Sequence, residues 1–500
     1  MKDNNIIIIG SGLGGLSAGV FLAKSGYDVI VLEQSNQMGG CLQCFQRRGI
    51  KFETGMHFIG STNEGQALRK LMKALEIDDK IRLSPLDPNG YDVVSLNGKQ
   101  YEFANGRDPF IEKMAGYFPH QRENLIKYWS LVENVANSSS LHTLRFDQAQ
   151  NVFDMEYQMR PMDQVIDTVI TDPMLAKVLA GTLPLYAAEK GKTPFSTHAF
   201  IMDFYNCSAS RVVNGSDSIA KALGDVLGKY GGRVLCGKKA KRIICDDTKA
   251  LGVECEDGSF FEADFIMSGV HPLRTLEMLK GVSLIRPAYR KRLMSMKQTV
   301  GGFAVYLHFK RNKVPYMNYN YYAYRQDTPW DCETYTPEEW PKGYLYMHFC
   351  HEPFPKFAQA GVVLSYMQMK DVEKWKGSKV GHRGEEYEEF KERHAQKLLS
   401  ILERDFPIIK GNIEHYYTST PLTYSDYTGT EGGSMYGIAK DVNAGLGGRV
   451  SHRTHIPNLF LTGQNVNSHG MLGTLVGSIV SCSGILPINS IYKCIQDANT

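Results

Sequence analysis

The sequence predicts an α/β protein in which a parallel sheet with a β-meander is joined to an inserted α+β domain. Three observations support this fold class: a short strand–helix–strand pattern at the N-terminus, the return of the same rhythm in the middle and at the end of the chain, and two long stretches of mixed character between these parts. With 500 residues, 43% of them hydrophobic, the chain is long enough for more than one domain.

The N-terminal pattern begins with an unbroken apolar run of four isoleucines over residues 6–9. Such a run is typical of a strand that is buried on both faces of a parallel sheet. Residues 14–25 place Leu16 and Val20 among small residues and predict a helix, and residues 28–33 predict the next strand. The N-terminal segment is therefore expected to form a compact strand–helix–strand unit.

The same rhythm returns after residue 215. The predicted elements are a helix over 216–230, a short strand over 233–236, three closely spaced strands over 240–246, 250–256 and 260–268, a strand over 458–463, and a helix over 473–485. We therefore expect a discontinuous dinucleotide-binding domain built from residues 1–85, 215–285 and 440–500. Residues 86–214 and 286–439 are expected to form a second, substrate-binding domain, with helices over 121–134 and 173–179.

Residues 10–15 match the pattern G-x-G-x-x-G in the context that it requires, between a buried strand and a helix. Gly10 allows the tight turn, Gly12 lets the backbone approach a pyrophosphate, and Gly15 lets helix and strand pack closely. The N-terminus of the helix then faces the phosphates. Glu33 ends the next strand, where its carboxylate accepts hydrogen bonds from a ribose and repels a phosphate on that ribose. The first domain is thus predicted to be Rossmann-type, with NADP disfavoured at this site.

Two further signatures favour FAD over NAD as the bound dinucleotide. FAD-binding members of this class resemble one another in a Gly-Gly pair after the acidic residue, which Gly39 and Gly40 match here. The segment Leu461-Thr-Gly-Gln464 resembles their second FAD signature, but the usual Asp at the ribityl chain is replaced by Gln464 or shifted to Asn465. In the class, the helix that follows points its N-terminus at the pyrimidine edge of the flavin, which is often anionic when reduced.

The predicted FAD contacts come from these signatures and from the segments that run beside the cofactor in the class. They are Gly10, Ser11, Gly12, Gly14, Gly15, Glu33, Gln34, Gly39, Gly40, Gly55, Met56, Ala240, Gly463, Gln464, Gly470, Leu472 and Gly473. No second G-x-G-x-x-G occurs, so NAD(P)H is expected at most as a transiently docking reductant. No metal site is expected.

Several stretches carry a family resemblance. Gly39-Gly-Cys-Leu-Gln-Cys-Phe45, Phe52-Glu-Thr-Gly-Met-His-Phe-Ile-Gly60 and Leu461-Thr-Gly-Gln-Asn465 resemble the retinol saturase branch of the phytoene desaturase and carotenoid isomerase family. The resemblance also covers residues 240–272 and is weak in the two inserted stretches. It implies an FAD-dependent oxidoreductase acting on a carbon–carbon double bond of an apolar isoprenoid, polyene or lipid. Saturation is the expected reaction, with desaturation and cis–trans isomerisation as alternatives.

A different class of protein is the remaining alternative. Rab escort proteins and GDP-dissociation inhibitors bind prenyl lipids on a similar fold without flavin chemistry. The intact Gly10, Gly12, Gly15 and Glu33 argue against this interpretation, because a lipid binder needs no dinucleotide turn. The sequence also departs from the family at Asn214-Gly215, where Gly-Gly is usual.

Three side chains are candidate proton donors. His57 lies in a segment that, by the resemblance, runs beside the flavin, and a histidine suits proton transfer near neutral pH. The alternative is a histidine that only orients the loop. Tyr436 precedes the last FAD strand and His469 precedes the flavin-facing helix, and for both a packing role is the commoner explanation.

Two other motifs are interpreted as structural. Cys41 and Cys44 form C-x-x-C, but no second cysteine pair with ligand spacing exists and family members carry ordinary residues here, so zinc and a redox disulfide are both disfavoured. Five tyrosines precede Trp330: Tyr316, Tyr319, Tyr321, Tyr322 and Tyr324. They either line an apolar tunnel or, more commonly, belong to a half-buried strand.

The resemblance implies an apolar small molecule as the partner, and the charge balance, a net charge of +3, gives no reason to expect a nucleic acid. Two basic clusters are each expected to be solvated, with contact to anionic lipid as the alternative for the second: Lys238, Lys239, Lys241 and Arg242, and Arg286, Arg290, Lys291 and Arg292. The sequence shows no secretory signal, no apolar stretch of the about 18 residues that a membrane helix needs, and no cysteine spacing typical of a disulfide framework. A cytoplasmic protein is therefore expected, with peripheral membrane contact as an alternative.

Overall fold

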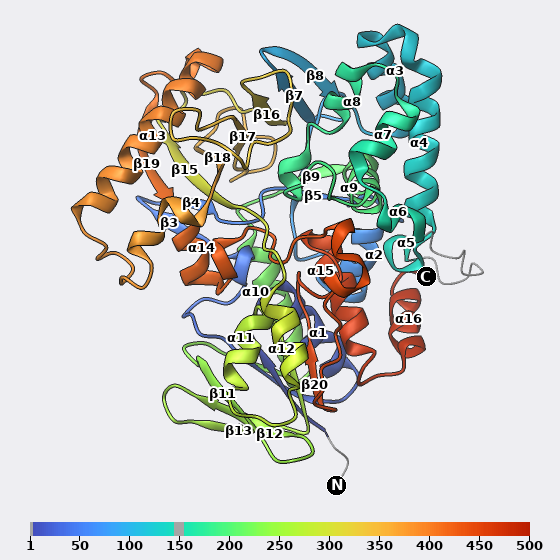
Figure 1. The fold of residues 1–500 in the computed structure, drawn as a ribbon, viewed down its shortest axis with the longest axis vertical. Coiled ribbons are helices and arrows are strands. Elements are labelled where there is room, and N and C mark those ends of the chain that lie inside the picture. The colour runs from blue at the N-terminus through green and yellow to red at the C-terminus, as the bar shows by residue number, and fades with distance from the viewer. Residues whose placement is uncertain (1–3, 145–154) are drawn as a thin grey trace.

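A five-stranded parallel sheet forms the centre of the first domain in the computed structural model, which describes residues 4–144 and 155–500 (Figure 1). Its strand order is β10-β2-β1-β14-β20, and every neighbouring pair is parallel. The strands are β1 (Asn5–Ile9), β2 (Asp28–Leu32), β10 (Arg233–Leu235), β14 (Phe265–Ser268) and β20 (Leu459–Leu461). They come from all three segments predicted for the dinucleotide-binding domain, and the α/β fold class is confirmed.

Helices and the meander cover both faces of this sheet, which explains the unbroken apolar run in β1. Ile6 and Ile8 pack against one layer of helices, and Ile7 and Ile9 pack on the opposite face against the meander and two further helices. The first layer consists of α1 (Leu13–Lys24), α10 (Asp217–Lys229) and α15 (Gly470–Cys482), and the second includes α11 (Pro272–Met278) and α12 (Pro287–Met294).

The strand predicted over residues 260–268 is two strands. β13 (Phe260–Glu262) completes the meander with β11 (Ala240–Cys245) and β12 (Ala250–Cys255), and the chain then enters the parallel sheet as β14. Between the two strands, the carboxylate of Asp264 accepts hydrogen bonds from the backbone N–H groups of Asn4 and Asn5, each at 2.9 Å. This contact with the start of β1 redirects the chain, and local sequence spacing does not reveal it.

A seven-stranded mixed sheet forms the second domain, in the order β19-β15-β18-β17-β16-β7-β8. Its strands are β7 (Asp92–Leu96), β8 (Lys99–Phe103), β15 (Gly301–Phe309), β16 (Asn320–Tyr324), β17 (Gly343–His348), β18 (Ala360–Met367) and β19 (Ile413–Ser419). A helical layer covers one face and α13 (Glu385–Asp405) covers the other (Figure 1). That layer contains α3 (Arg107–Tyr117), α4 (Arg122–Asn137), α7 (Met162–Val169), α8 (Pro173–Leu179) and α9 (Phe195–Cys207).

Three members of the tyrosine run, Tyr321, Tyr322 and Tyr324, lie in β16, and all five residues of this strand are buried. Tyr322 and Tyr324 pack beneath the helical layer, whereas Tyr321 packs on the side of α13. The expectation of a half-buried strand is therefore wrong, because both faces of this sheet are covered. The tyrosine rings are part of the core of the second domain.

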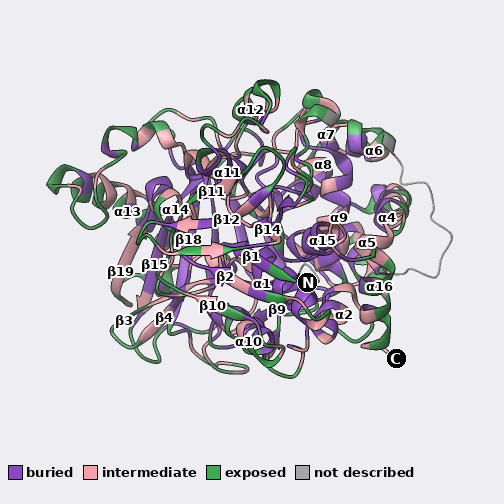
Figure 2. Ribbon diagram, turned by 90° about the horizontal axis from the view of Figure 1, so that it is seen from below, coloured by how far each residue is buried: buried purple, intermediate pink, exposed green. Residues whose placement is uncertain are grey.

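Small sheets tie the two domains together. β5 (Ile59–Gly60) and β6 (Leu83–Pro85) both pair with β9 (Ala209–Val212). A hairpin is formed by β3 (Cys44–Arg47) and β4 (Ile50–Glu53), and its Phe45 and Phe52 rings pack on Tyr306 of the seven-stranded sheet. Figure 2 shows buried residues running through both sheets. The remaining helices are α2 (Ala67–Ala74), α5 (Ser140–Thr143), α6 (Met155–Met159), α14 (Pro421–Thr428) and α16 (Ile488–Asp497). None of the helices in the described part of the chain is long and apolar enough to cross a membrane.

Candidate functional site

The glycine turn after β1 has the geometry that a dinucleotide requires. Gly10 adopts a φ of +93°, a left-handed conformation that favours glycine. A Cβ on Gly15 would lie 2.2 Å from the carbonyl oxygen of Gly10, so only glycine lets α1 pack this closely on the turn. Gly12 differs, because a Cβ there would meet no atom within 4 Å. The backbone at Gly12 therefore faces open space, as a cradle for a pyrophosphate does.

The carboxylate of Glu33 ties this turn to the end of β2. Its Oε2 accepts hydrogen bonds from Ser11 N at 3.0 Å and from Ser11 Oγ at 2.5 Å, and its Oε1 accepts one from Ser35 N at 2.8 Å. A carboxylate can accept about four hydrogen bonds, so one position remains for a ribose hydroxyl. Glu33 thus also builds the turn, a role that the sequence did not predict.

The Gly-Gly strip lies directly against the glycine turn. Gly39 forms a parallel bridge with Gly12, and a Cβ on Gly40 would lie 3.1 Å from the Cα of Gly12. Gly55 is held equally close, since its Cβ would lie 2.9 Å from the carbonyl oxygen of Cys41. These approaches fit a cofactor that runs between closely spaced backbones.

The C-terminal signature meets the N-terminal one. A Cβ on Gly14 would lie 2.8 Å from the Cα of Gly463, so segments from opposite ends of the chain pack directly against each other here. The amide oxygen of Asn465 accepts a hydrogen bond from Ile438 N at 2.8 Å and so holds the preceding strap of chain. Of the two residues predicted to replace the usual Asp, Gln464 is the one whose side chain makes no hydrogen bond with described residues, and it remains the predicted partner of the ribityl chain.

The other predicted contacts occupy different environments. Met56 and Leu472, the latter on α15, are buried in the core of the first domain, Gln34 is exposed, and Ala240 is half-buried at the start of β11. Gly470 has a φ of +76° and begins α15, three residues before the predicted start at Gly473. The N-terminus of α15 therefore lies beside the FAD signature at Gly463, with His469 as its N-cap.

Tyr436 and His469 are brought together by the fold, with ring centroids 5.0 Å apart. The hydroxyl of Tyr436 donates a hydrogen bond to the carbonyl oxygen of Pro184 at 3.0 Å, and burial raises its pKa. Burial, and then the nearby cation of Lys440, lower the pKa of His469 to about 3. At neutral pH His469 is thus a neutral imidazole and does not supply a proton as an imidazolium.

His57 lies apart from this pair, next to a carboxylate that the sequence reasoning missed. Its Nδ1 is 3.5 Å from Oε2 of Glu53, and its ring stacks on Phe349 with centroids 5.7 Å apart. Burial raises the pKa of Glu53, so this carboxyl holds a proton to a higher pH than usual. The four-residue spacing of Glu53 and His57 in the strand-to-loop segment was the only available signal.

The buried guanidinium of Arg211 fixes the His57 loop. Arg211 is 1% exposed, and it donates hydrogen bonds to the carbonyl oxygens of His57 at 3.2 Å and Tyr319 at 3.1 Å. Its cation also acts against the raised pKa of Glu53. The loop is therefore held from the second domain, through β9, which places an acid–base pair at the junction of the two domains.

Cys41 and Cys44 are free thiols. Burial raises the pKa of both, that of Cys44 to about 12. A thiol with a raised pKa forms little thiolate, which is the reactive species in redox exchange. The hydroxyl of Ser216 lies 3.5 Å from the sulfur of Cys44, a contact that fits a packing role.

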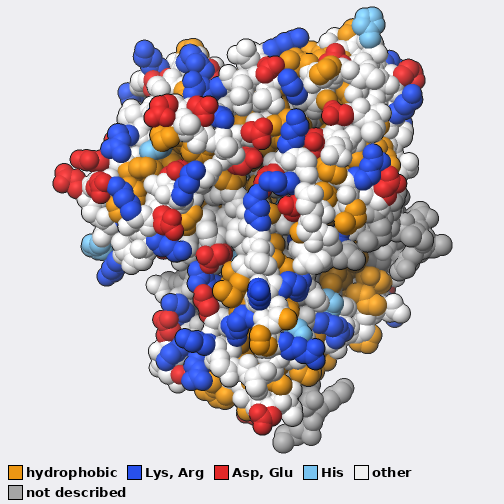
Figure 3. Space-filling view, in the orientation of Figure 1, with side chains coloured by type: hydrophobic (Ala, Val, Ile, Leu, Met, Phe, Trp, Pro, Cys, Tyr) orange, Lys and Arg blue, Asp and Glu red, His pale blue; other side chains and the backbone are white. Residues whose placement is uncertain are grey.

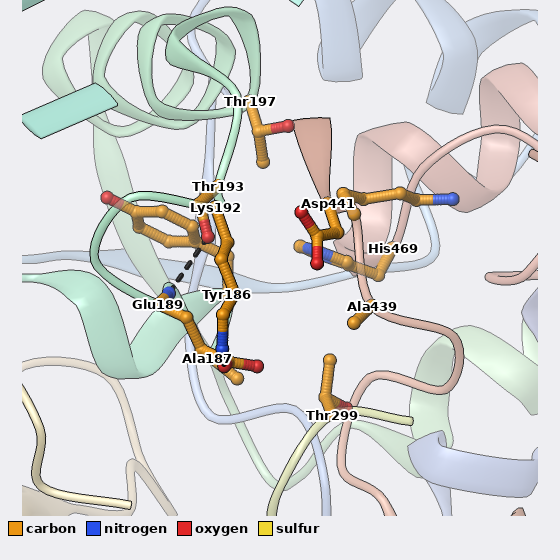
Figure 4. Close-up of a pocket in the computed structure, with 11 residues that line it drawn as sticks. Tyr186, Ala187, Glu189, Lys192, Thr193, Thr197, Thr299, Ala439, Asp441 and His469 are labelled. Atoms are coloured by element: carbon orange, nitrogen blue, oxygen red, sulfur yellow. Dashed lines mark hydrogen bonds and ion pairs between the residues drawn. The ribbon is translucent and has the colours of Figure 1, made fainter. Parts of the chain in front are cut away.

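A pocket opens between the two domains beside His469 (Figure 4). Its walls come from residues 186–197, which reach into the first turn of α9, from a residue shortly before β15, from the strap at residues 439–441 that leads to β20, and from the N-cap of α15. The lining residues are Tyr186, Ala187, Glu189, Lys192, Thr193, Thr197, Thr299, Ala439, Lys440, Asp441 and His469. In Figure 4 Glu189 pairs with Lys192 on one side, while Asp441 and His469 lie on the other.

Lys440 makes no hydrogen bond or ion pair with any residue that the structure describes. Burial, and then the cation of Arg449, lower the pKa of Lys440 from 10.5 to about 8. The ammonium is therefore held at a cost, close to the N-cap of α15. A positive charge there favours an electron-rich cofactor, as the helix N-terminus does.

The Lys440→Met variant is expected to be more stable than the wild type at pH 7, by about 1–2 kcal/mol after allowance for partial exposure. The folded protein holds this proton less tightly than the unfolded chain. The cost is therefore complete below pH 8 and fades as the pH rises from about 8 to 10.5. Thermal unfolding of both proteins at pH 7 and pH 10 measures the difference. Lys280→Met, at an exposed lysine, is the control, and a less stable Lys440→Met protein at pH 7 would contradict the assignment.

Comparisons with known proteins agree with this geometry. A family model described as flavin containing amine oxidoreductase matches residues 13–477. The chain belongs to this family. The predicted cofactor, FAD, and the class of FAD-dependent oxidoreductase are thereby confirmed. In this flavoprotein the open space at Gly12 would hold the pyrophosphate, the Glu33 carboxylate would bind the adenosine ribose, and the ribityl chain would lie near Gly463.

Similar proteins include all-trans-retinol 13,14-reductases and prolycopene isomerases. The chain is 27% identical to all-trans-retinol 13,14-reductase of Rattus norvegicus, over 98% of this chain and 86% of that protein. It is 24% identical to the chloroplastic prolycopene isomerase of Arabidopsis thaliana, over 92% and 78%. These relatives confirm the resemblance to the retinol saturase and carotenoid isomerase branch.

Solved structures share the fold at low identity. An oxidoreductase from Methanosarcina mazei superposes with a TM-score of 0.63 at 16% identity and covers 95% of this chain and 99% of its own. Putrescine oxidase bound to putrescine gives a TM-score of 0.63 at 12% identity, with 99% and 98% covered. At this identity the likeness concerns the fold alone.

Proposed function

We propose that this flavoprotein saturates a carbon–carbon double bond in a long apolar polyene or isoprenoid. The observation that carries the proposal is the extent of the likeness to the retinol reductases, which covers 98% of the chain and thus includes the inserted stretches where substrate would bind. A buried acid–base pair, His57 with Glu53, next to the aromatic rings of Phe349 and Phe52 fits a protonation step in an apolar site.

Saturation divides the work between cofactor and protein. Bound FAD supplies a two-electron carrier that exchanges a hydride with carbon. The chain has three tasks. The glycine turn and Glu33 anchor the dinucleotide, and the positive end of α15 together with Lys440 favours an electron-rich flavin. His57 moves a proton to the second carbon, while Glu53 balances the charge of the His57 ring. Tyr436 and His469, both without an easily released proton, are assigned to the wall of the site.

The test is the return of flavin absorbance when chemically reduced protein meets substrate without oxygen. All-trans-retinol or a related polyene is expected to reoxidise the flavin and to gain two hydrogens. If the polyene changes only its double-bond geometry and the flavin stays reduced, the protein is an isomerase, as the isomerase relatives allow. A colourless protein that cannot be reconstituted with FAD would leave the prenyl-lipid binder as the remaining interpretation.

The reductant and the compartment are part of the proposal. We propose NAD(P)H as the electron donor. Its docking would be transient, because the chain has no second G-x-G-x-x-G. Loss of flavin absorbance when NAD(P)H is added without oxygen checks the proposal. A cytoplasmic location is supported by ten free cysteines, five of them buried, as thiols persist in reducing compartments.

A further inference from the structure

Two basic clusters that look alike in the sequence differ in the structure. In the first, on the meander, each lysine faces a carboxylate. Lys238 pairs with Asp257, Lys239 with Glu256 at 2.8 Å, and Lys241 with Glu254 at 3.7 Å. The charges of this cluster are largely neutralised, so it attracts anions weakly.

The second cluster has no carboxylate partner among the residues that the structure describes. Arg286, Arg290, Lys291 and Arg292 of the α12 region are joined by Arg449 and Arg453, and we call these six residues the α12 patch. Arg292 donates hydrogen bonds to the carbonyl oxygens of Gly447 and Arg449, both at 2.9 Å, which fixes the two segments side by side. No member of the patch forms an ion pair with a described residue, and neither residues 278–300 nor residues 442–463 contain Asp or Glu.

The field of the patch acts on its neighbours. The cation of Arg453 adds to the burial that lowers the pKa of His452, and Arg449 adds to the burial that lowers the pKa of Lys440. Figure 3 shows Lys and Arg side chains gathered over this part of the molecule. Four of the six, Arg286, Lys291, Arg449 and Arg453, are exposed and are therefore available to an external anion.

An exposed apolar side chain ends the helix that carries these cations. Met294, the last residue of α12, is 67% exposed and follows Lys291 and Arg290 by three and four residues, the spacing of neighbours on one helix face. An exposed methionine beside Arg and Lys is typical of surfaces that lie at the boundary between lipid head groups and acyl chains. The patch also adjoins the pocket. Thr299, in the wall of the pocket, follows Met294 by five residues, and the charge of Arg449 lowers the pKa of the pocket residue Lys440.

We propose that the α12 patch docks the protein on an anionic lipid bilayer, with Met294 inserted among the head groups and the pocket turned toward the membrane. The proposal rests on the proposed function in one respect, that an apolar polyene is dissolved in the bilayer and enters from there. Among phosphate-bearing partners the bilayer is favoured over a soluble nucleotide, since the exposed methionine has no use in nucleotide binding and the donors of Arg290 and Arg292 are engaged by backbone carbonyls.

Cosedimentation of the FAD-loaded protein with vesicles tests the docking surface. Binding is expected to vesicles of phosphatidylcholine with phosphatidylserine, to weaken with added salt, and to be much weaker with phosphatidylcholine alone. The triple variant Arg286→Gln, Lys291→Gln, Arg453→Gln is expected to bind about 100-fold more weakly, since each cation near an anionic surface contributes roughly a factor of five. Met294→Gln is expected to weaken binding with its salt dependence retained.

The matched control removes the same charge elsewhere. The triple variant Lys238→Gln, Lys239→Gln, Lys241→Gln is expected to bind like the wild type, because these lysines face carboxylates. Retained flavin absorbance verifies that each variant is folded. Equal losses in both triple variants, equal binding to neutral vesicles, or displacement by NADPH at constant ionic strength would overturn the proposal.

The two proposals fail separately. Vesicle binding through the patch without any reaction with polyenes would overturn only the proposed function. If the protein turns over detergent-dispersed polyene but does not bind anionic vesicles, only the proposal of a docking surface is overturned. If both hold, the α12 triple variant is expected to lose activity on vesicle-embedded polyene and to keep it on detergent-dispersed polyene.

Discussion

Gly12→Asp is expected to yield a folded, colourless protein. The position faces open space, so the side chain meets no protein atom that would resist it. The same space receives the pyrophosphate, and a carboxylate beside it adds steric overlap and like-charge repulsion worth several kcal/mol, so FAD affinity should fall by at least about 100-fold. Flavin absorbance per protein, thermal unfolding without FAD, and titration with FAD measure the two effects separately.

Gly15→Ala provides the contrast for this prediction. Its Cβ would lie 2.2 Å from the carbonyl oxygen of Gly10, so the turn itself must shift and the protein without FAD should lose stability. Gly228→Ala, in helix α10 and with no atom within 4 Å of its Cβ, controls for the change from glycine to alanine in a helix without steric overlap. A yellow Gly12→Asp protein with wild-type FAD content would show that the dinucleotide does not pass this turn.

The His57→Gln variant, which breaks the His57–Glu53 pair, is expected to slow the reoxidation of reduced flavin by substrate about 10²–10⁴-fold. This is the usual contribution of a general acid to a reaction rate. FAD content and substrate affinity should stay close to those of the wild type, because His57 is not among the predicted FAD contacts. Stopped-flow mixing of the reduced protein with polyene measures the step directly.

The pH profile separates proton transfer from loop support. Burial raises the pKa of Glu53, and Glu53→Gln removes that titrating group, so its reoxidation rate should follow a different pH dependence from that of the wild type. A structural role would scale the rate equally at every pH. His142→Gln is the matched control, since His142 on α5 forms a similar pair with Asp203 on α9, with Nε2 and Oδ2 3.1 Å apart. An unchanged rate in His57→Gln would remove His57 from proton transfer.

Local chemistry allowed much of the site to be predicted. A turn that opens onto phosphates requires glycines at fixed positions, and Gly10, Gly12 and Gly15 occupy them in the structure as expected. The prediction failed where a long-range contact determined the outcome. The single strand expected over 260–268 breaks at Asp264 because its carboxylate caps the start of β1, and β16 is buried on both faces because α13 returns from 60 residues further along to cover it.

The sequence by itself determined the fold class, the cofactor and the family, because these depend on backbone requirements that short motifs record. Only the tertiary structure decided which polar groups work together. The Asn465 side chain binds the strap at Ile438, whereas the Gln464 side chain makes no hydrogen bond with described residues. Glu53 lies next to His57, whose loop is fixed by Arg211, and one basic cluster is neutralised while the α12 patch forms no ion pair with a described residue. The physical reason is that charge pairing and burial are set by side chains that meet across both domains, at separations where local patterns carry no information.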